Sequence, residues 1–319
     1  SVVVTASTDH IVRLWDAQTG EPLEALPAHR SWIYDLTVSP AGNYVASVCM
    51  NGEVWVWDLA LGAEKHVLQQ FMPLSVCFSP DGQSLAIGGA GRQLHLFDTS
   101  TGTQVIQYKG VGKQIRTLAI SPDGQSLASG GWDSTIMLWE FSTGRHVGTL
   151  AGHSRDVTSL AFSPDDGNVL ASSAGDGTVK LWDIAARDER ETLRGHSATV
   201  FSVAFSPDGS ILASGAGDST VKLWYLGENR EPESLPTDGP ALSVAFSPDG
   251  ETLACAAGNT VRFWRTVAVE GSDALDRRWD LQRRARSILE TEPQQQRRVL
   301  ADLRNHLAAA VNEMTLRDI

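Results

Sequence analysis

The sequence predicts an all-β fold, a seven-bladed propeller, on the strength of two observations. A segment that ends in an aromatic residue recurs with spacings of 42, 40, 42, 43, 42 and 40 residues, at Trp15, Trp57, Phe97, Trp139, Trp182, Trp224 and Trp264. A Ser-Pro-Asp-Gly turn, or a close variant of it, also recurs between short β-favouring runs. A period of about 40–45 residues with this pattern is typical of propellers, in which each repeat forms one four-stranded blade.

The sixth repeat shows the elements expected in each blade. Residues 199–205 and 211–216 are short β-favouring runs, joined by the turn 206–209, and a third run follows at 220–225. Pro and Asp suit the central positions of a type I turn, and Gly supplies the positive φ that closes the hairpin. The runs show little alternation between polar and apolar residues, which indicates strands buried on both faces between neighbouring blades.

A serine, a histidine and an aspartate within residues 195–224 are the residue types of a hydrolase. However, the segment ILASGAGDSTVKLW (211–224) has near copies at 126–140 and 169–183 and looser ones at 2–16, 44–58, 84–98 and 252–264. One domain rarely carries several copies of one active site. We therefore interpret these residues as structural.

The repeats resemble those of the WD-repeat β-propeller family, over roughly residues 1–266. In that family the histidine of a Gly-His pair, a strand serine, a turn aspartate and the tryptophan form a hydrogen-bonded chain inside each blade. The resemblance implies two such structural tetrads here: His153, Ser172, Asp176 and Trp182 in repeat five, and His196, Ser214, Asp218 and Trp224 in repeat six. A buried indole N–H needs an acceptor, and this chain supplies one.

Other repeats depart from the tetrad. Repeat three has Ile87, Gly91 and Phe97 at the serine, aspartate and tryptophan positions, repeat four has no histidine, and repeat two has Asn51 in place of the aspartate. We expect blades three and four to be less constrained, with connecting loops that are free to bind a ligand.

The resemblance also implies a function, because propellers of this family bind proteins or peptides where loops lead into the innermost strands around the central channel. Large aromatic residues and Arg at such positions are typical of binding hot spots. The candidates for partner binding are Trp32, Tyr34, Phe71, Met72, Arg116, Trp132 and Phe201. An alternative remains open in which Trp32 and Trp132 fold over their own blades as caps.

Composition limits the partners and the compartment. The formal net charge is −12, and an acidic surface disfavours nucleic acid or an anionic membrane as the main partner. No apolar run approaches the length of a membrane span. Cys49, Cys77 and Cys255 fall within or beside expected strands, so we expect buried, reduced thiols in a cytoplasmic protein.

The sequence contains no complete catalytic or cofactor motif. The segment GVGKQ (110–114) lacks the first Gly and the Ser or Thr of a phosphate loop. The histidines and cysteines show no metal-ligand spacing. We expect no cofactor, no metal and no enzymatic activity, hence a non-catalytic interaction scaffold or recognition (sensor) module. The alternative is a propeller enzyme, hydrolase-like, with an unrecognised site in its channel.

The composition changes after Arg265, so we place a boundary between a propeller at 1–266 and a C-terminal segment at 267–319. Residues 266–270 are expected to form the outermost strand of blade seven. Residues 272–290 and 293–314 have the apolar spacing of two helices. These helices either pack as a hairpin on the propeller or form a docking or oligomerising segment.

The sequence contains seven third strands, each ending near the recurring aromatic residue, but only six innermost strands. Blade one is the blade without an innermost strand. Aligning Thr5 with Ser214 and Asp9 with Asp218 makes the chain begin at the second strand of that blade. A missing inner strand exposes backbone hydrogen-bonding groups that pair readily with another segment. We therefore expect a strand from an upstream segment or a second chain to complete blade one, and the chain alone to be poorly soluble or oligomeric.

Overall fold

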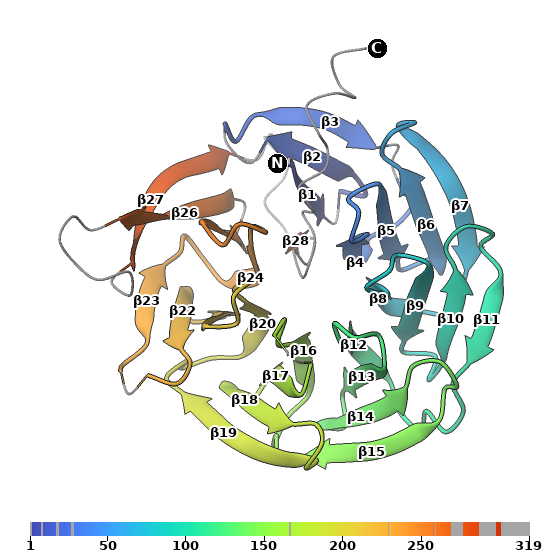
Figure 1. Cartoon of the computed structure of the whole chain (residues 1–319). Helices are drawn as coiled ribbons and strands as arrows, with labels where there is room; N and C mark the ends of the chain where they lie inside the picture. Colours follow the sequence, from blue (N-terminus) through green and yellow to red (C-terminus); the bar gives the residue numbers. More distant parts are fainter. Residues whose placement is uncertain are drawn as a thin grey trace.

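Seven four-stranded antiparallel sheets stand around a central axis in the computed structural model (Figure 1), which confirms the seven-bladed propeller. The structure describes residues 2–7, 9–16, 19–26, 29–165, 167–228, 230–258 and 260–268, and the backbone of 277–286 and 298–300. Within these residues no helix has the length and the apolar character that a membrane crossing requires.

Each blade has one strand at the channel, two middle strands and one at the rim. The innermost strands of blades two to seven are β4 (Ile33–Val38), β8 (Pro73–Phe78), β12 (Ile115–Ile120), β16 (Val157–Phe162), β20 (Val200–Phe205) and β24 (Ala241–Phe246). The second strands of blades one to seven are β1 (Val2–Ser7), β5 (Tyr44–Cys49), β9 (Ser84–Gly89), β13 (Ser126–Gly131), β17 (Val169–Ala174), β21 (Ile211–Ala216) and β25 (Thr252–Ala257).

The third strands end at or just after the recurring aromatic residue, except in blade seven, where the strand continues. They are β2 (Val12–Asp16), β6 (Glu53–Asp58), β10 (Leu94–Asp98), β14 (Thr135–Glu140), β18 (Thr178–Asp183), β22 (Thr220–Tyr225) and β26 (Thr260–Ala268). The strands on the rim are β3 (Pro22–Leu26), β7 (Ala63–Gln69), β11 (Gln104–Gln107), β15 (His146–Ala151), β19 (Asp188–Arg194), β23 (Glu233–Pro236) and β27 (Arg277–Arg286).

The Ser-Pro-Asp-Gly turns join first and second strands as the sequence predicts. In blade three the Gly82 amide donates to the Ser79 carbonyl at 2.8 Å, which is the bond of a β-turn. The Ser79 hydroxyl donates to Asp81 at 2.5 Å and accepts the Ser84 amide at 2.9 Å. Gly82 has a φ of 69°, a conformation that glycine adopts without strain.

The hydrophobic core is divided among the spaces between neighbouring blades. One cluster joins Val4 and Leu14 of blade one to Leu36 and Trp57 of blade two, and the other blade pairs have similar clusters. Both faces of the middle strands are therefore buried, which is why these strands lack polar alternation.

Hydrogen bonds between innermost strands tie the ring together near the channel. The third residue of one inner strand accepts the backbone N–H of the fourth residue of the next: Asp35 from Val76 at 3.0 Å, Ser75 from Leu118 at 3.1 Å, Ser159 from Val203 at 3.3 Å, and Ser202 from Val244 at 3.2 Å. Each such bond crosses from one blade to the next. Short polar residues recur at this position because the bond needs them.

The C-terminal region corrects two expectations. Residues 266–268 continue the third strand, β26, and the outermost strand of blade seven is β27, with Leu281 opposite Trp264. The helix expected over 272–290 is therefore wrong for 277–286. The free edge of β26 offers backbone donors and acceptors to residues 277–286. Pairing along this edge overrides the helix propensity of that segment. The rest of both expected helices, apart from 298–300, lies outside the described residues.

Blade one is completed from within the chain. The short strand β28 (Arg298–Leu300) pairs antiparallel with β1, with Thr5 opposite Leu300 and Ser7 opposite Arg298. It lies between β24 and β4 at the channel (Figure 1). The expectation of an upstream or second-chain strand is thus wrong at these three positions, because a C-terminal segment pairs with the free edge of β1. The sheet also continues past residue 266, where the domain boundary was placed.

Candidate functional site

The tetrads of blades five and six form continuous hydrogen-bonded chains. In blade five the Trp182 indole N–H donates to the Ser172 hydroxyl at 2.8 Å. Ser172 also bonds the Nε2 atom of His153 at 2.7 Å, and the Nδ1 atom of His153 bonds Asp176 at 3.1 Å. In blade six the corresponding bonds, from Trp224 through Ser214 and His196 to Asp218, are all 2.8 Å.

Burial fixes the charge states in these chains. It lowers the pKa of His153, and the Asp176 carboxylate opposes that shift only in part, so the histidine is neutral. Burial also disfavours ionisation of Asp176, yet hydrogen bonds from Thr178 and from the Ser154 amide outweigh it and lower its pKa to about 2. The His153–Asp176 contact is therefore a hydrogen bond from a neutral N–H to a carboxylate.

The same burial excludes these serines from catalysis. The side chains of Ser172 and Ser214 are completely buried, so no substrate carbonyl reaches either hydroxyl. Each hydroxyl already bonds the indole and the histidine of its own blade. Thus the tetrads of blades five and six hold strands together.

Blade four has no histidine in its tetrad, and a lysine pairs with its turn aspartate instead. The Trp139 indole still donates to Ser129 at 2.9 Å. The turn aspartate, Asp133, accepts the Thr135 hydroxyl at 2.8 Å and pairs with Lys113, whose ammonium lies 3.2 Å away. Lys113 is largely exposed, so this ion pair adds little stability.

Blade three has no tetrad, and blade two has an incomplete one. In blade two His29 Nε2 bonds Ser47 at 2.6 Å, but the Asn51 side chain accepts from the Cys49 thiol at 2.7 Å. The indole N–H of Trp57 and the Nδ1 atom of His29 are buried without a hydrogen-bond partner. Orphaned buried polar atoms are costly, and each requires an explanation.

Exposed apolar side chains gather on one arc of the ring. Nine large hydrophobic residues are exposed in the described part of the chain. Five of them lie in loops before the innermost strands, or in turns between second and third strands, of blades two to four: Trp32, Met50, Phe71, Met72 and Trp132. We call these five residues the aromatic arc.

Backbone contacts show that both kinds of loop lie on one face. The Met50 amide donates to the Trp32 carbonyl at 2.9 Å, and the Ala90 amide donates to the Met72 carbonyl at 2.9 Å. Phe71 lies against Gly91, where a Cβ atom would come within 2.7 Å of its ring. The loop before each inner strand therefore contacts the turn of its own blade.

The structure separates the predicted partner-binding residues into two groups. Trp32, Phe71, Met72 and Trp132 are exposed, and Trp132 is 62% exposed, so it does not cap its own blade. The other three, Tyr34, Arg116 and Phe201, are half-buried.

Each of these three already has neighbours. Tyr34 packs against the core between blades two and three. Phe201 lies beside Gly217, and Arg116 forms an ion pair with Asp156. They border the face without projecting from it as the aromatic arc does.

Sequence reasoning missed two features of this region. Met50 is 50% exposed beside Trp32 and belongs to the aromatic arc, although it is not among the partner-binding candidates that the sequence predicts. His29, Cys49 and Glu53 come from separate segments, and they lie together in space. No short motif joins these three residues, so only the fold shows their proximity.

Comparisons with known proteins agree with the fold. The family model of the WD40 repeat (WD domain, G-beta repeat) matches residues 20–58, 66–98, 102–140, 144–183, 187–225 and 234–265. Similar curated proteins include transcription initiation factor TFIID subunit 5 of Caenorhabditis elegans, 33% identical over 32% of this chain. Activating molecule in BECN1-regulated autophagy protein 1B of Danio rerio is 32% identical over 31% of the chain.

The guanine nucleotide-binding protein subunit beta-1 of Drosophila melanogaster is 27% identical over 37% of the chain. The matched segments span 16%, 7% and 36% of these three relatives' own lengths. The similarity therefore concerns the propeller repeats and not the whole of any relative.

Proposed function

Because the chain belongs to the WD40 repeat family, whose propellers serve as protein-interaction scaffolds, we propose that it is a non-catalytic recognition module. It binds a protein or peptide on the face of blades two to four that carries the loops before the innermost strands and the turns between second and third strands. The observation that carries this proposal is the aromatic arc. Exposed aromatic and methionine side chains on adjacent blades are the residue types that dominate binding energy at protein interfaces.

The relatives support a role in assemblies. Two of the three are named as subunits, one of an initiation factor and one of a guanine nucleotide-binding protein. A propeller suits such a role because its rigid blades hold loops from several repeats on one face. Cys49, Cys77 and Cys255 form no disulfide bond, which suits the proposed cytoplasmic location.

A capture experiment tests the proposal. The chain is immobilised, exposed to lysate of its source organism, and the retained proteins are quantified by mass spectrometry. We expect a specific partner to be retained by the wild-type chain and to be lost with the double variant Trp132→Ala/Phe71→Ala.

The matched control replaces exposed apolar residues on the rim, with the double variant Leu23→Ala/Val105→Ala. These side chains are exposed to a similar degree on β3 and β11. Equal loss of the partner with rim and arc variants would contradict binding through the aromatic arc.

A further inference from the structure

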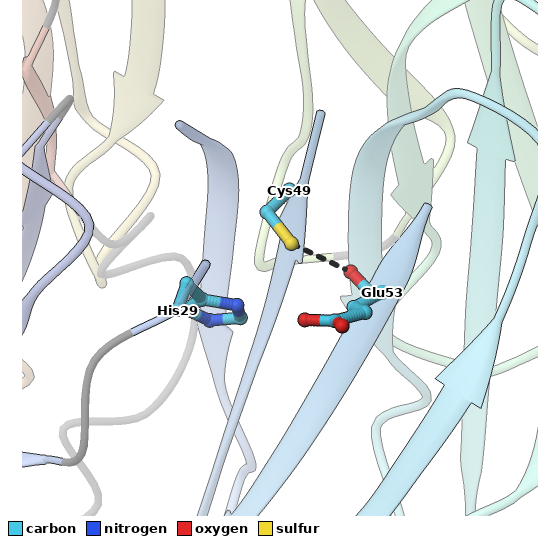
Figure 2. A group of neighbouring side chains, drawn as sticks. All are labelled: His29, Cys49 and Glu53. Atoms are coloured by element: carbon cyan, nitrogen blue, oxygen red, sulfur yellow. Dashed lines mark hydrogen bonds between the residues drawn. The ribbon is translucent and has the colours of Figure 1, made fainter. Parts of the chain in front are cut away.

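Three metal-ligating side chains meet inside blade two. His29 precedes β4, Cys49 ends β5 and Glu53 begins β6. Their candidate ligand atoms, an imidazole nitrogen, the thiol sulfur and a carboxylate oxygen, all lie within 4.8 Å of one another. Figure 2 shows the Glu53 carboxylate turned toward the His29 ring, with the Cys49 sulfur near the Glu53 backbone.

The other blades do not have this combination. At the last residue of the second strand, where blade two has Cys49, they have Ser7, Gly89, Gly131, Ala174, Ala216 and Ala257. Four residues before the recurring aromatic residue, where blade two has Glu53, they have Ile11, Gln93, Thr135, Thr178, Thr220 and Thr260. Blade two thus lacks the tetrad's aspartate and has instead a thiol and a carboxylate, both near its histidine.

The orphaned atom of His29 is the second observation. His29 is only 3% exposed, and its Nδ1 atom has no hydrogen-bond partner. Its Nε2 atom bonds Ser47 at 2.6 Å, whose hydroxyl is free of the Trp57 indole that occupies it in complete tetrads. Ser47 can therefore accept from Nε2–H, which leaves an unprotonated Nδ1, as in metal-binding histidines whose other nitrogen is bonded.

In the metal-free protein the Cys49 thiol lies 2.7 Å from the Asn51 side-chain oxygen, to which it donates, and 3.2 Å from the Glu53 carbonyl oxygen. Metal binding replaces these thiol contacts, because the thiolate is the form of cysteine that binds a metal.

We propose that His29 Nδ1, the Cys49 sulfur and the Glu53 carboxylate bind one Zn²⁺ ion, with water as the fourth ligand. Nitrogen, sulfur and oxygen together are ligands that zinc accepts. Tetrahedral bonds of about 2.0–2.3 Å hold ligand atoms about 3.3–3.7 Å apart. Separations of up to 4.8 Å therefore need to close by up to about 1 Å. Rotation of the partly exposed Glu53 side chain exchanges its bond from the Trp55 indole, 3.0 Å long, for the ion, and rotation of the Cys49 side chain adjusts the position of the sulfur.

The binding step balances in charge and protons. The sulfur–zinc bond forms as the Cys49 thiol releases its proton to solvent, and the neutral imidazole and the ionised carboxylate bind without losing one. The ion would link the loop before β4 to the ends of β5 and β6, as the tetrad aspartate links loop and turn in blades five and six. It would thereby stabilise the loop that presents Trp32 and the turn that presents Met50.

Cobalt titration of the full chain, freed of any affinity tag, tests the site. Co²⁺ replaces Zn²⁺ in such sites, and a cobalt–thiolate bond gives a near-ultraviolet charge-transfer absorption. We expect this absorption to saturate at one Co²⁺ per chain and to disappear when Zn²⁺ is added. Absence of the absorption in the wild-type chain would overturn the proposal.

Matched variants assign the ligands. Cys49→Ala should abolish the absorption, whereas Cys77→Ala, which removes a thiol from β8 of blade three, should keep it. Glu53→Thr installs the residue that blades five and six have at this position and so favours a folded chain. It should weaken Co²⁺ binding at least tenfold. Absorption that persists in Cys49→Ala, or unchanged affinity in Glu53→Thr, would contradict the assigned ligands.

Discussion

At the scale of single residues, the buried tryptophan determines which polar partners a blade needs, in every blade except blade three, which has Phe97 at that position. In blade six the chain from Trp224 to Asp218 satisfies each of its members, so loss of one leaves the others unpaired. We predict that His196→Ala and Asp218→Ala each lower the free energy of unfolding by about 1–3 kcal/mol.

Asn51→Ala is the matched comparison, because blade two already lacks a continuous chain. It should cost less than either blade-six variant. Urea unfolding of the three variants with chelator present measures the difference, and an equal cost for all three would contradict the role assigned to the tetrads.

The tetrad histidines also predict a pH dependence. Burial lowers the pKa of His153 and His196 from the usual 6.5, although Asp176 and Asp218 oppose the shift, and Lys180 and Lys222 add to it. The nearby Glu189 also opposes the shift of His153. Below pH 6.5 the unfolded chain therefore binds more protons than the folded one, so stability is complete above that pH and falls as the pH falls.

Unfolding midpoints in urea between pH 7.5 and pH 5 measure this slope. We expect His196→Asn to reduce the slope, since it removes one of the groups that titrate differently in the two states. A wild-type midpoint that is constant over this range, or a slope that His196→Asn leaves unchanged, would show that these histidines are not buried as neutral groups.

The sequence predicted the tetrads because each is a local pattern repeated at a fixed spacing. It also predicted Trp32 and Trp132 as loop residues, since their positions follow from register with the other repeats. It did not predict that Tyr34 packs into the core or that Arg116 pairs with Asp156. Those contacts join neighbouring blades, and no spacing within one repeat encodes them.

At the scale of elements, the edge of β1 determines how the ring closes. β28 has three residues, whereas the other innermost strands have six. Its backbone pairs with β1 and so covers donors and acceptors that would otherwise be free. The C-terminal segment that contains β28 therefore has a structural role.

Truncation tests that role. Removal of residues 287–319 deletes β28, and we predict a loss of about 1–3 kcal/mol in unfolding free energy together with self-association through the exposed edge. Removal of 301–319 alone retains β28 and should leave both properties unchanged. Light scattering and thermal unfolding measure the two effects. A stable monomer after the longer truncation would show that β28 is dispensable.

The C-terminal strands show where sequence patterns are insufficient. Residues 277–286 have helical apolar spacing and no glycine or proline, yet they form β27 beside β26. The third strand of blade seven requires a partner at the rim, and that requirement is visible only in the assembled sheet. The blades with complete repeats were predictable because local propensity and tertiary pairing agree in them.

At the scale of the whole molecule, the residues that keep the ring rigid are different from the residues that we propose bind a partner. Inter-blade bonds from Asp35, Ser75, Ser159 and Ser202 and the buried tryptophans hold the ring. The aromatic arc lies outside that network, on loops of adjacent blades. Because the ring is rigid, loops from different repeats can contact one partner with little loss of conformational entropy on binding.

The most direct test of this separation compares Trp132→Ala with Trp182→Ala. Thermal unfolding is measured for each variant, and so is the affinity for the partner that the capture experiment identifies. Trp132 is 62% exposed and Trp182 only 2%. Trp132→Ala should leave the melting temperature nearly unchanged and weaken binding by about 2 kcal/mol or more, whereas Trp182→Ala should destabilise the fold by about 3–5 kcal/mol. Similar destabilisation by both, or unchanged affinity in Trp132→Ala, would contradict the account.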